Sequence, residues 1–215
     1  MKACIFDLDG TLTDTLESLV YSVNASLAEL DLPPITPMQC RRFVGNGARV
    51  LMERALIASG DEGAARIEEG MEAYGRIFGE NCMYHVGPYD GIPDVLEAMK
   101  QKGIKLAVLS NKPHRQTVNV VETVFGKGYF EYVQGQIDGI PKKPDPGCVY
   151  ELLDKMGVSK EECLYVGDSE VDVATGIAAG VTCIGVEWGF RDRQELIDAG
   201  AEHLIGHPVE LLNFI

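Results

Sequence analysis

The sequence feature that most constrains this chain is a short apolar run near its amino terminus that ends in two acidic residues. Residues 3–6, Ala-Cys-Ile-Phe, are followed by Asp7, Leu8, Asp9 and Gly10. A short, uninterrupted apolar run is typical of a strand that is buried on both faces of a parallel sheet. Asp7 and Asp9 are two residues apart, so on an extended backbone their side chains point to the same side. The sequence therefore predicts two carboxylates at the carboxyl end of a central strand, where open α/β sheets bind their ligands.

Beyond residue 85 the chain predicts a parallel sheet covered by helices on both faces, the doubly wound α/β class. Short apolar segments alternate there with amphipathic helical segments, and this alternation is typical of such a sheet. Four further strands are expected, at residues 105–109, 132–134, 163–166 and 182–186. Together with residues 3–6, these strands would form the centre of one domain.

Residues 15–84 have a different pattern, with four helical segments and no convincing strand. A helix is expected from about residue 15 to about residue 30, with Asp14 or Thr15 as its cap. Thr36 begins a second helix, because a threonine cap, a proline at the first helical position and a glutamine three residues after the cap form a helix-start signal. A further helix is expected over residues 61–82. The pattern predicts a compact helical insert.

These two patterns predict two domains. At 215 residues the chain is long enough for one sizeable core and a smaller module. We expect residues 1–14 and 85–215 to form the α/β core domain, because both segments contain strands of the same sheet. Residues 15–84 would then form the inserted helical domain.

Composition and charge argue against several classes of function. The formal net charge of −14 argues against nucleic acid as a partner. The six cysteines are scattered without a Cys-x-x-Cys pair, which argues against a zinc site or a disulfide framework and fits a reducing cytoplasm. Met1-Lys2 runs straight into the first strand without a signal peptide, and no apolar stretch approaches the length of a membrane span. We therefore expect a cytoplasmic protein without nucleic-acid or membrane partners.

Ser110 and Asn111 follow the strand expected at residues 105–109. The hydroxyl of Ser110 and the backbone amide of Asn111 would face the same edge of the sheet as Asp7. Pro113 begins the next helix, whose free backbone N–H groups suit a phosphate. Taken alone, however, this pair favours an ordinary helix cap.

Lys143 lies in the segment Lys142-Lys143-Pro144-Asp145-Pro146, in which two prolines restrict the backbone. A lysine in a loop is most often a solvated surface side chain. Because the chain is strongly acidic, a site for an anionic substrate would have to build local positive charge from a metal and a few basic residues.

A second pair of acids follows the strand expected at residues 163–166. Asp168 comes directly after Gly167, and Asp172 lies four residues further on, so one helical turn would bring the two to the same face. In the alternative interpretation, Asp168 caps a helix and Asp172 is a surface acid. Both interpretations place Asp168 at the carboxyl end of a strand.

In this order, the motifs resemble those of the haloacid dehalogenase superfamily, whose members are mostly phosphatases. Residues 7–14 match its first motif, Asp-x-Asp-Gly-Thr-Leu-x-Asp, and Ser110 matches the second. The superfamily's lysine immediately precedes Pro-x-Pro, which selects Lys143 over Lys142. Residues 167–172 match the last motif, Gly-Asp-x-x-x-Asp. The resemblance covers the whole chain and implies a Rossmann-like core.

Among the subgroups, the chain is most similar to the phosphoglycolate phosphatase group, which has a helical cap domain inserted after the first motif. Residues 44–48, Val-Gly-Asn-Gly-Ala, and residues 51–56 are similar to that group's cap segment. The resemblance implies that Gly45, Asn46 and Gly47 form a substrate-facing loop. An ordinary turn between helices explains the same three residues.

The resemblance also implies a mechanism. Mg²⁺ would be held by Asp7, the main-chain carbonyl of Asp9 and Asp168. Asp7 would attack phosphorus and form an aspartyl-phosphate, while Asp9 would protonate the leaving oxygen and later deprotonate the hydrolytic water. Lys143 would supply a second positive charge, and Asp172 would orient Lys143 or a metal-bound water.

The remaining predicted site residues would bind the phosphate and exclude water. The resemblance assigns Ser110, Asn111 and Lys143 to the oxygens of the transferring phosphoryl group. The cap would supply specificity and keep bulk water out during the reaction. Trp188 and Phe190, in a glycine-flanked stretch after the last expected strand, are interpreted as packing residues.

Several alternatives remain open. Asp9 argues against a haloacid dehalogenase, which acts on carbon, and the absence of histidine from residues 15–30 argues against a phosphoglucomutase. A pyrophosphatase or a broad sugar-phosphate phosphatase shares every core motif. A non-catalytic binding module on the same fold is a further alternative. We expect a phosphatase for a small phosphorylated metabolite, phosphoglycolate-like, that is a monomer or a weak dimer.

Overall fold

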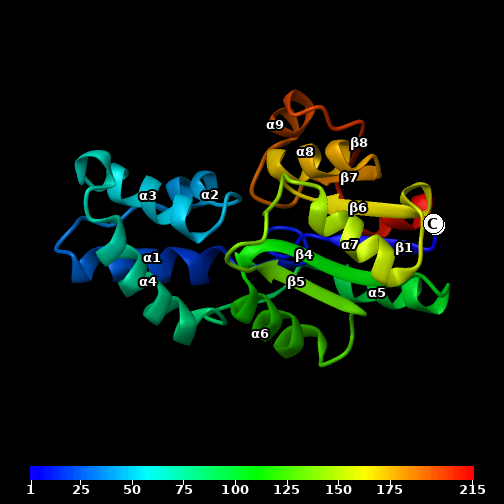
Figure 1. Ribbon diagram of the computed structural model, residues 1–215, viewed down its shortest axis with the longest axis horizontal. Coiled ribbons are helices and arrows are strands. Elements are labelled where there is room, and N and C mark those ends of the chain that lie inside the picture. Colours follow the sequence, from blue (N-terminus) through cyan, green and yellow to red (C-terminus); the bar gives the residue numbers. More distant parts are fainter. The chain divides into compact units, whose positions relative to one another are not determined.

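Six parallel strands form the sheet of the α/β unit, in the order β5-β4-β1-β6-β7-β8 (Figure 1). The computed structural model describes residues 1–215. Its sheet strands are β1 (Ala3–Phe6), β4 (Lys105–Pro113), β5 (Tyr132–Gln136), β6 (Cys163–Gly167), β7 (Thr182–Val186) and β8 (His203–Ile205). The doubly wound α/β class expected from the sequence is confirmed.

The helices of this unit lie on both sides of the sheet (Figure 1). They are α5 (Ile92–Gln101), α6 (His114–Phe125), α7 (Gly147–Met156), α8 (Glu170–Ala179) and α9 (Arg193–Asp198), with 3₁₀ turns η2 (Lys160–Glu162) and η3 (Pro208–Phe214). Alternate strand residues such as Ala3, Ile5 and Tyr165 pack with Leu152 and Met156 of α7 in one apolar cluster. All four residues of β1 are fully buried, because strands pair with it on both sides and helices cover both of its faces.

Two features of the sheet differ from expectation. β4 continues to Pro113, four residues beyond its expected end, and its pairing with β5 shifts register between Leu109 and Pro113. Ser110 and Asn111 therefore lie within the strand instead of in the turn after it. β8 was not expected, because a three-residue strand is too short to show a periodic pattern.

Residues Thr15–Gly87 form a second compact unit, and the first comprises Met1–Asp14 and Pro88–Ile215. The chain passes between the units beside the two-residue strands β2 (Thr13–Asp14) and β3 (Gly87–Pro88). The second unit is helical, with α1 (Leu16–Glu29), α2 (Pro37–Phe43), α3 (Ala48–Ala58), the 3₁₀ turn η1 (Glu62–Ala64) and α4 (Ile67–Asn81). The fold thus places the helical insert after the first strand and its following turn.

Within the helical unit, local signals explain most of the helix boundaries. Thr36 caps α2 as expected, because its hydroxyl accepts the Gln39 backbone N–H while the Gln39 side chain accepts the Thr36 N–H. Thr15 precedes α1, but its side chain makes no cap bond, so the expected side-chain capping is wrong for this residue. The helix expected over residues 61–82 begins only at Ile67, because Gly63 and Ala64 have φ of 64° and 51°, which an α-helix does not accommodate. No helix of the chain is long and apolar enough to cross a bilayer.

Candidate active site

The carboxyl ends of three neighbouring strands bring the predicted polar residues to one edge of the sheet. Asp7 follows β1, Ser110 lies in the last part of β4, and Asp168 follows β6, and β1 pairs with both β4 and β6. All three residues are buried. Because parallel strands end at the same edge of a sheet, this edge of the α/β unit is the candidate active site.

Lys143 lies in the loop between β5 and α7, and its ammonium group contacts two of the acids. Its Nζ is 3.0 Å from Asp7 Oδ1 and 2.7 Å from Asp172 Oδ1. The residue is 3% exposed, so the interpretation of a solvated surface lysine is wrong. Burial alone would lower the pKa of Lys143, but the carboxylates of Asp172 and Asp7 outweigh burial and raise the pKa above its ordinary value. Lys143 is therefore a fixed positive charge in the site.

Asn111 holds the backbone of Lys143 from two sides. Its Nδ2 donates to the Lys143 carbonyl oxygen at 3.0 Å, and its Oδ1 accepts the Lys143 N–H at 3.0 Å. Neither Asn111 nor Ser110 caps the following helix, because α6 begins at His114 after Pro113 and has no side-chain cap bond. The helix-cap interpretation is therefore wrong, and Asn111 fixes the loop that carries the lysine.

Asp172 is enclosed in the first turn of α8. Ser169 is the N-cap of this helix, and its Oγ and backbone N–H donate to Asp172 Oδ2 at 2.5 and 3.1 Å. Asp172 Oδ1 accepts the Tyr165 hydroxyl at 3.0 Å as well as the lysine ammonium group. Because Asp172 is fully buried and Ser169 provides the cap, the alternative of a surface acid after a capping Asp168 is wrong.

Asp168 packs against the turn that follows β1. The Thr11 hydroxyl donates to its Oδ1 at 3.1 Å, and the Phe190 backbone N–H donates to its Oδ2 at 2.7 Å. Gly10 in that turn has φ of +83°, and a Cβ atom at this position would overlap with the Asp168 carboxylate. The glycine of the first motif is thus required both for its backbone conformation and for the space it leaves to Asp168.

Sequence reasoning missed Lys112. Its Nζ lies 2.9 Å from Asp9 Oδ1, and both side chains are at least nine-tenths buried. The signal was present in Ser110-Asn111-Lys112-Pro113, since residues 110 and 112 share a face of an extended strand. It was not recognised because β4 was expected to end at Leu109.

The acids of the site carry more negative charge than the lysines offset. Asp7, Asp9, Asp168 and Asp172 are all buried, and Lys112 and Lys143 are the basic side chains that contact them. Burial raises the pKa of Asp7 from its ordinary value of 3.8 to about 7, with Lys143 lowering it and the neighbouring acids raising it. Burial, with repulsion from Asp172 and Asp7, raises the pKa of Asp168 well above its ordinary value. Additional positive charge at this point would favour the ionised acids.

The donor atoms fit a hard divalent cation. Asp7, Asp168 and Asp172 each present one carboxylate oxygen, and these three atoms lie within 4.8 Å of one another. An all-oxygen set of this kind suits Mg²⁺, which prefers carboxylates and water. The grouping includes two of the three ligands expected from the sequence, Asp7 and Asp168, together with Asp172, which was expected in a supporting role.

The predicted loop Gly45-Asn46-Gly47 belongs to the helical unit, whereas every other predicted site residue belongs to the α/β unit. The loop joins α2 to α3, and Gly47 is the N-cap of α3. Gly45 and Gly47 have φ of 120° and 88°, which side chains disfavour. Both glycines are therefore required by the backbone of this loop.

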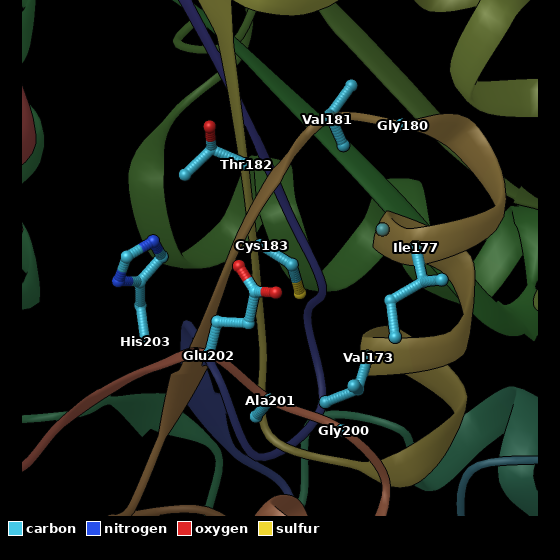
Figure 2. Close-up of a pocket in the computed structure, with 11 residues that line it drawn as sticks. Val173, Ile177, Gly180, Val181, Thr182, Cys183, Gly200, Ala201, Glu202 and His203 are labelled. Atoms are coloured by element: carbon cyan, nitrogen blue, oxygen red, sulfur yellow. The ribbon is translucent and has the colours of Figure 1, made fainter.

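A separate hollow of about 350 Å³ lies at the opposite edge of the sheet, between α8 and the first residues of β7 and β8 (Figure 2). Val173 and Ile177 on α8 line one side of it, and Thr182 and His203 line the other. None of the predicted site residues is among its lining. Burial raises the pKa of the Cys183 thiol in this hollow to about 12, so the thiol is not a ready nucleophile.

Comparison with known proteins agrees with this geometry. The family model of the haloacid dehalogenase-like hydrolases matches residues 4–186. A phosphoglycolate phosphatase of Pseudomonas putida is 35% identical over 208 residues, which cover 95% of this chain and 75% of that protein. A phosphoglycolate phosphatase of Haemophilus influenzae is 34% identical over 218 residues, 98% of this chain and 96% of that protein.

A solved structure has the same architecture. The crystal structure of a candidate phosphoglycolate phosphatase from Lactobacillus delbrueckii superposes with a TM-score of 0.92 at 31% identity, covering 100% of this chain and 98% of that one. The family model spans the strand ends that carry Asp7 and Asp168 and the loop that carries Lys143. The chain therefore belongs to the haloacid dehalogenase-like hydrolase family, and it is a phosphoric monoester hydrolase similar to phosphoglycolate phosphatases.

Proposed function

We propose that the protein is a Mg²⁺-dependent phosphatase that hydrolyses a small phosphate monoester, phosphoglycolate-like, through an aspartyl-phosphate on Asp7. The observation that carries this proposal is the buried group of four acids and two lysines at one edge of the sheet. Its excess of negative charge calls for a divalent cation before an anionic ester can approach. The names of relatives at about one-third identity support the same substrate class.

In this proposal Asp7 is the nucleophile. Both of its hydrogen-bonding contacts, from the Leu8 N–H at 2.7 Å and from Lys143, use Oδ1. Oδ2 is then available to attack phosphorus, and the P–O bond to the leaving alcohol breaks as the aspartyl-phosphate forms. Magnesium, held by Asp7, Asp168 and the main-chain carbonyl of Asp9, would supply charge stabilisation to the phosphoryl oxygens. Lys143 would bind the same oxygens as a fixed cation.

Asp9 is the proposed general acid and base. It lies two residues after the nucleophile on the same turn, and Lys112 holds its carboxylate. Protonated Asp9 would donate to the leaving alkoxide, and the resulting carboxylate would take a proton from the water that hydrolyses the aspartyl-phosphate. Ser110, buried within β4, would donate its hydroxyl to a phosphoryl oxygen.

Specificity is proposed to come from the helical unit, acting as a cap domain to the α/β catalytic core. The core residues act on the phosphoryl group, which every candidate substrate shares, so they do not select among leaving groups. The backbone of Gly45 and Gly47 and the amide of Asn46 offer both donors and acceptors for a small polar substrate.

A panel of phosphate compounds tests the function. We expect Mg²⁺-dependent hydrolysis, with kcat/KM higher for phosphoglycolate than for sugar phosphates or pyrophosphate. A preference for pyrophosphate or for a sugar phosphate would replace the proposed substrate while keeping the reaction. If the protein hydrolyses none of these esters, including p-nitrophenyl phosphate, the phosphatase proposal is wrong and the alternative of a non-catalytic binding module is favoured.

Acid quenching of a reacting mixture tests the covalent step separately. Mass spectrometry of peptides should show one added phosphoryl group on the peptide that contains Asp7. The matched control is Asp14→Asn, an exposed acid on the same peptide, which should leave the modification in place. A phosphoryl group found on another residue would overturn the assignment of Asp7.

A further inference from the structure

We propose that residues Trp188–Phe190, named here the clamp segment, set the affinity of the site for Mg²⁺ by holding Asp168 and the turn after β1 in one arrangement. The inference rests on the proposed function, which places the metal at Asp168. It assigns a positioning role to a segment in which the sequence alone indicated two packing residues, Trp188 and Phe190. They follow β7, two strands away from β1 in the sheet.

The first contact of the clamp segment is with Asp168 itself. The Phe190 N–H donates to Asp168 Oδ2 at 2.7 Å while the Thr11 hydroxyl donates to Oδ1 at 3.1 Å, and both bonds are buried. A carboxylate held at both oxygens does not rotate freely about its χ2 torsion. Asp168 therefore presents its remaining lone pairs in a fixed direction.

The second contact is steric. Gly189 is buried, and a Cβ atom at this position would overlap with Asp168 Cβ and with the carbonyl oxygen of Gly10. Its φ is not in the left-handed region, so the backbone conformation does not demand glycine. The requirement for glycine is steric, because the loop passes so close to Asp168 and Gly10 that a single methyl group would displace one of them.

The third contact joins the clamp segment to the first motif. Trp188 Nε1 donates to the Thr11 carbonyl oxygen at 3.0 Å, across 177 residues of sequence. Thr11 thus accepts from Trp188 through its backbone and donates to Asp168 through its side chain. The loop, the turn after β1 and the expected metal ligand form one closed network of hydrogen bonds.

Residues that hydrogen-bond to metal ligands orient those ligands before the metal binds, and this orientation raises the affinity for the metal. Loss of such partners typically lowers metal affinity about 10–100-fold. Trp188→Phe removes the N–H while keeping an aromatic ring. Gly189→Ala adds the methyl group for which there is no room. Gly75→Ala is the matched control, because a Cβ atom at this α4 residue would have nothing within 4 Å.

The experiment is calorimetric titration of Mg²⁺ into each protein without substrate, with the melting temperature of each metal-free protein measured beside it. We expect Trp188→Phe to bind Mg²⁺ about tenfold more weakly than the unsubstituted protein, and Gly189→Ala more weakly still. Gly75→Ala should bind like the unsubstituted protein. If Gly189→Ala lowers the melting temperature, the Mg²⁺ affinity of Trp188→Phe is the measurement that tests the inference.

The outcomes separate this inference from the function on which it rests. Unchanged Mg²⁺ affinity in a folded Trp188→Phe protein would overturn the clamp and leave the proposed phosphatase intact. An unsubstituted protein that binds no Mg²⁺ would overturn the metal-dependent function, and the clamp with it. Equal weakening in Gly75→Ala would show a general loss of stability and would also overturn the clamp.

Discussion

The ammonium group of Lys112 lies 2.9 Å from the carboxylate of Asp9, and the pair is buried beside the turn that carries Asp7. The backbone of Lys112 is itself fixed, because its carbonyl oxygen accepts the Thr117 hydroxyl at 3.0 Å. Gly135 in β5 packs against this carbonyl so closely that a Cβ atom would crowd it. Lys112 therefore holds Asp9 from a rigid position, and this arrangement matters for a residue proposed to donate and accept a proton.

Replacement of Lys112 by Met should impair catalysis in a way that depends on the leaving group. An Asp9 carboxylate without its partner loses its orientation, so esters of poor leaving groups, which need protonation, should lose about tenfold or more in kcat/KM. Hydrolysis of p-nitrophenyl phosphate, whose leaving group needs less help, should change by less than about threefold. Lys102→Met, at an exposed lysine, is the control. Equal losses for both kinds of ester would contradict a role that acts through Asp9.

Asp7→Asn should abolish turnover without unfolding the protein. An amide does not form the covalent intermediate and is a poor ligand for Mg²⁺. The substitution also removes an ionisation that burial makes unfavourable, so the metal-free melting temperature at neutral to alkaline pH should be equal to or above that of the unsubstituted protein. The checks are steady-state kinetics and thermal melting. A kcat above about one-tenth of the original would rule out the nucleophile.

The contribution of Asp7 to metal-free stability should fall as pH rises from about 4 to about 7. Burial raises the pKa of Asp7 from 3.8 to about 7, so the folded chain binds a proton there that the unfolded chain has released, and stability declines across this window. The difference in melting temperature between the unsubstituted protein and Asp7→Asn isolates this group. As pH rises, the melting temperature of Asp7→Asn should increase relative to that of the unsubstituted protein. A difference that stays constant with pH would contradict the raised pKa of Asp7.

Mg²⁺ should stabilise the protein more at about pH 8 than at about pH 5, because metal ligands must be deprotonated. The pKa of Asp7, raised by burial to about 7, places the change between these two conditions, and burial raises the pKa of Asp168 in the same direction. Melting temperatures with and without millimolar Mg²⁺ measure it, and Asp168→Asn should remove most of the shift. An equal Mg²⁺ effect at both pH values would argue against binding at these acids.

Asn46→Ala tests the loop of the helical unit. We expect kcat/KM for the preferred small substrate to fall more than about tenfold, while p-nitrophenyl phosphate hydrolysis changes much less, because the loop is proposed to contact the leaving group. Substitution of Gly47 is a poorer test, since its φ of 88° would strain any side chain. If both substrates lose activity in step with a lower melting temperature, the loop is a structural turn.

The position of Asp7 directly after a central strand was predictable because it depends on a local pattern. A short apolar run indicates a buried strand, and no distant contact is needed to know where it ends. The same reasoning placed Asp168 directly after its strand, whereas Ser110 lies within β4, which continues to Pro113. The choice of Lys143 over Lys142 came from the neighbouring prolines through the resemblance to the family.

Other features of the site depend on how distant segments meet. The pairing of Lys112 with Asp9 spans 103 residues, and it required β4 to continue past its apolar stretch beside β1. The bonds from Asn111 to the backbone of Lys143 depend on where the loop after β5 passes. The sequence places Lys112 on the same strand face as Ser110, but it does not show that Asp9 is its partner, and it gives no signal for the bonds of Asn111.

The sequence by itself determined which chemical groups this protein presents at the carboxyl ends of its strands, because hydrophobic burial and strand alternation act over a few residues. Only the tertiary structure decided which partner each group has: Lys112 for Asp9, Asp172 for Lys143, and the clamp segment for Asp168. The physical reason is that buried polar groups need partners. Strand register and loop packing, which are properties of the whole sheet, determine which partner comes within hydrogen-bonding distance.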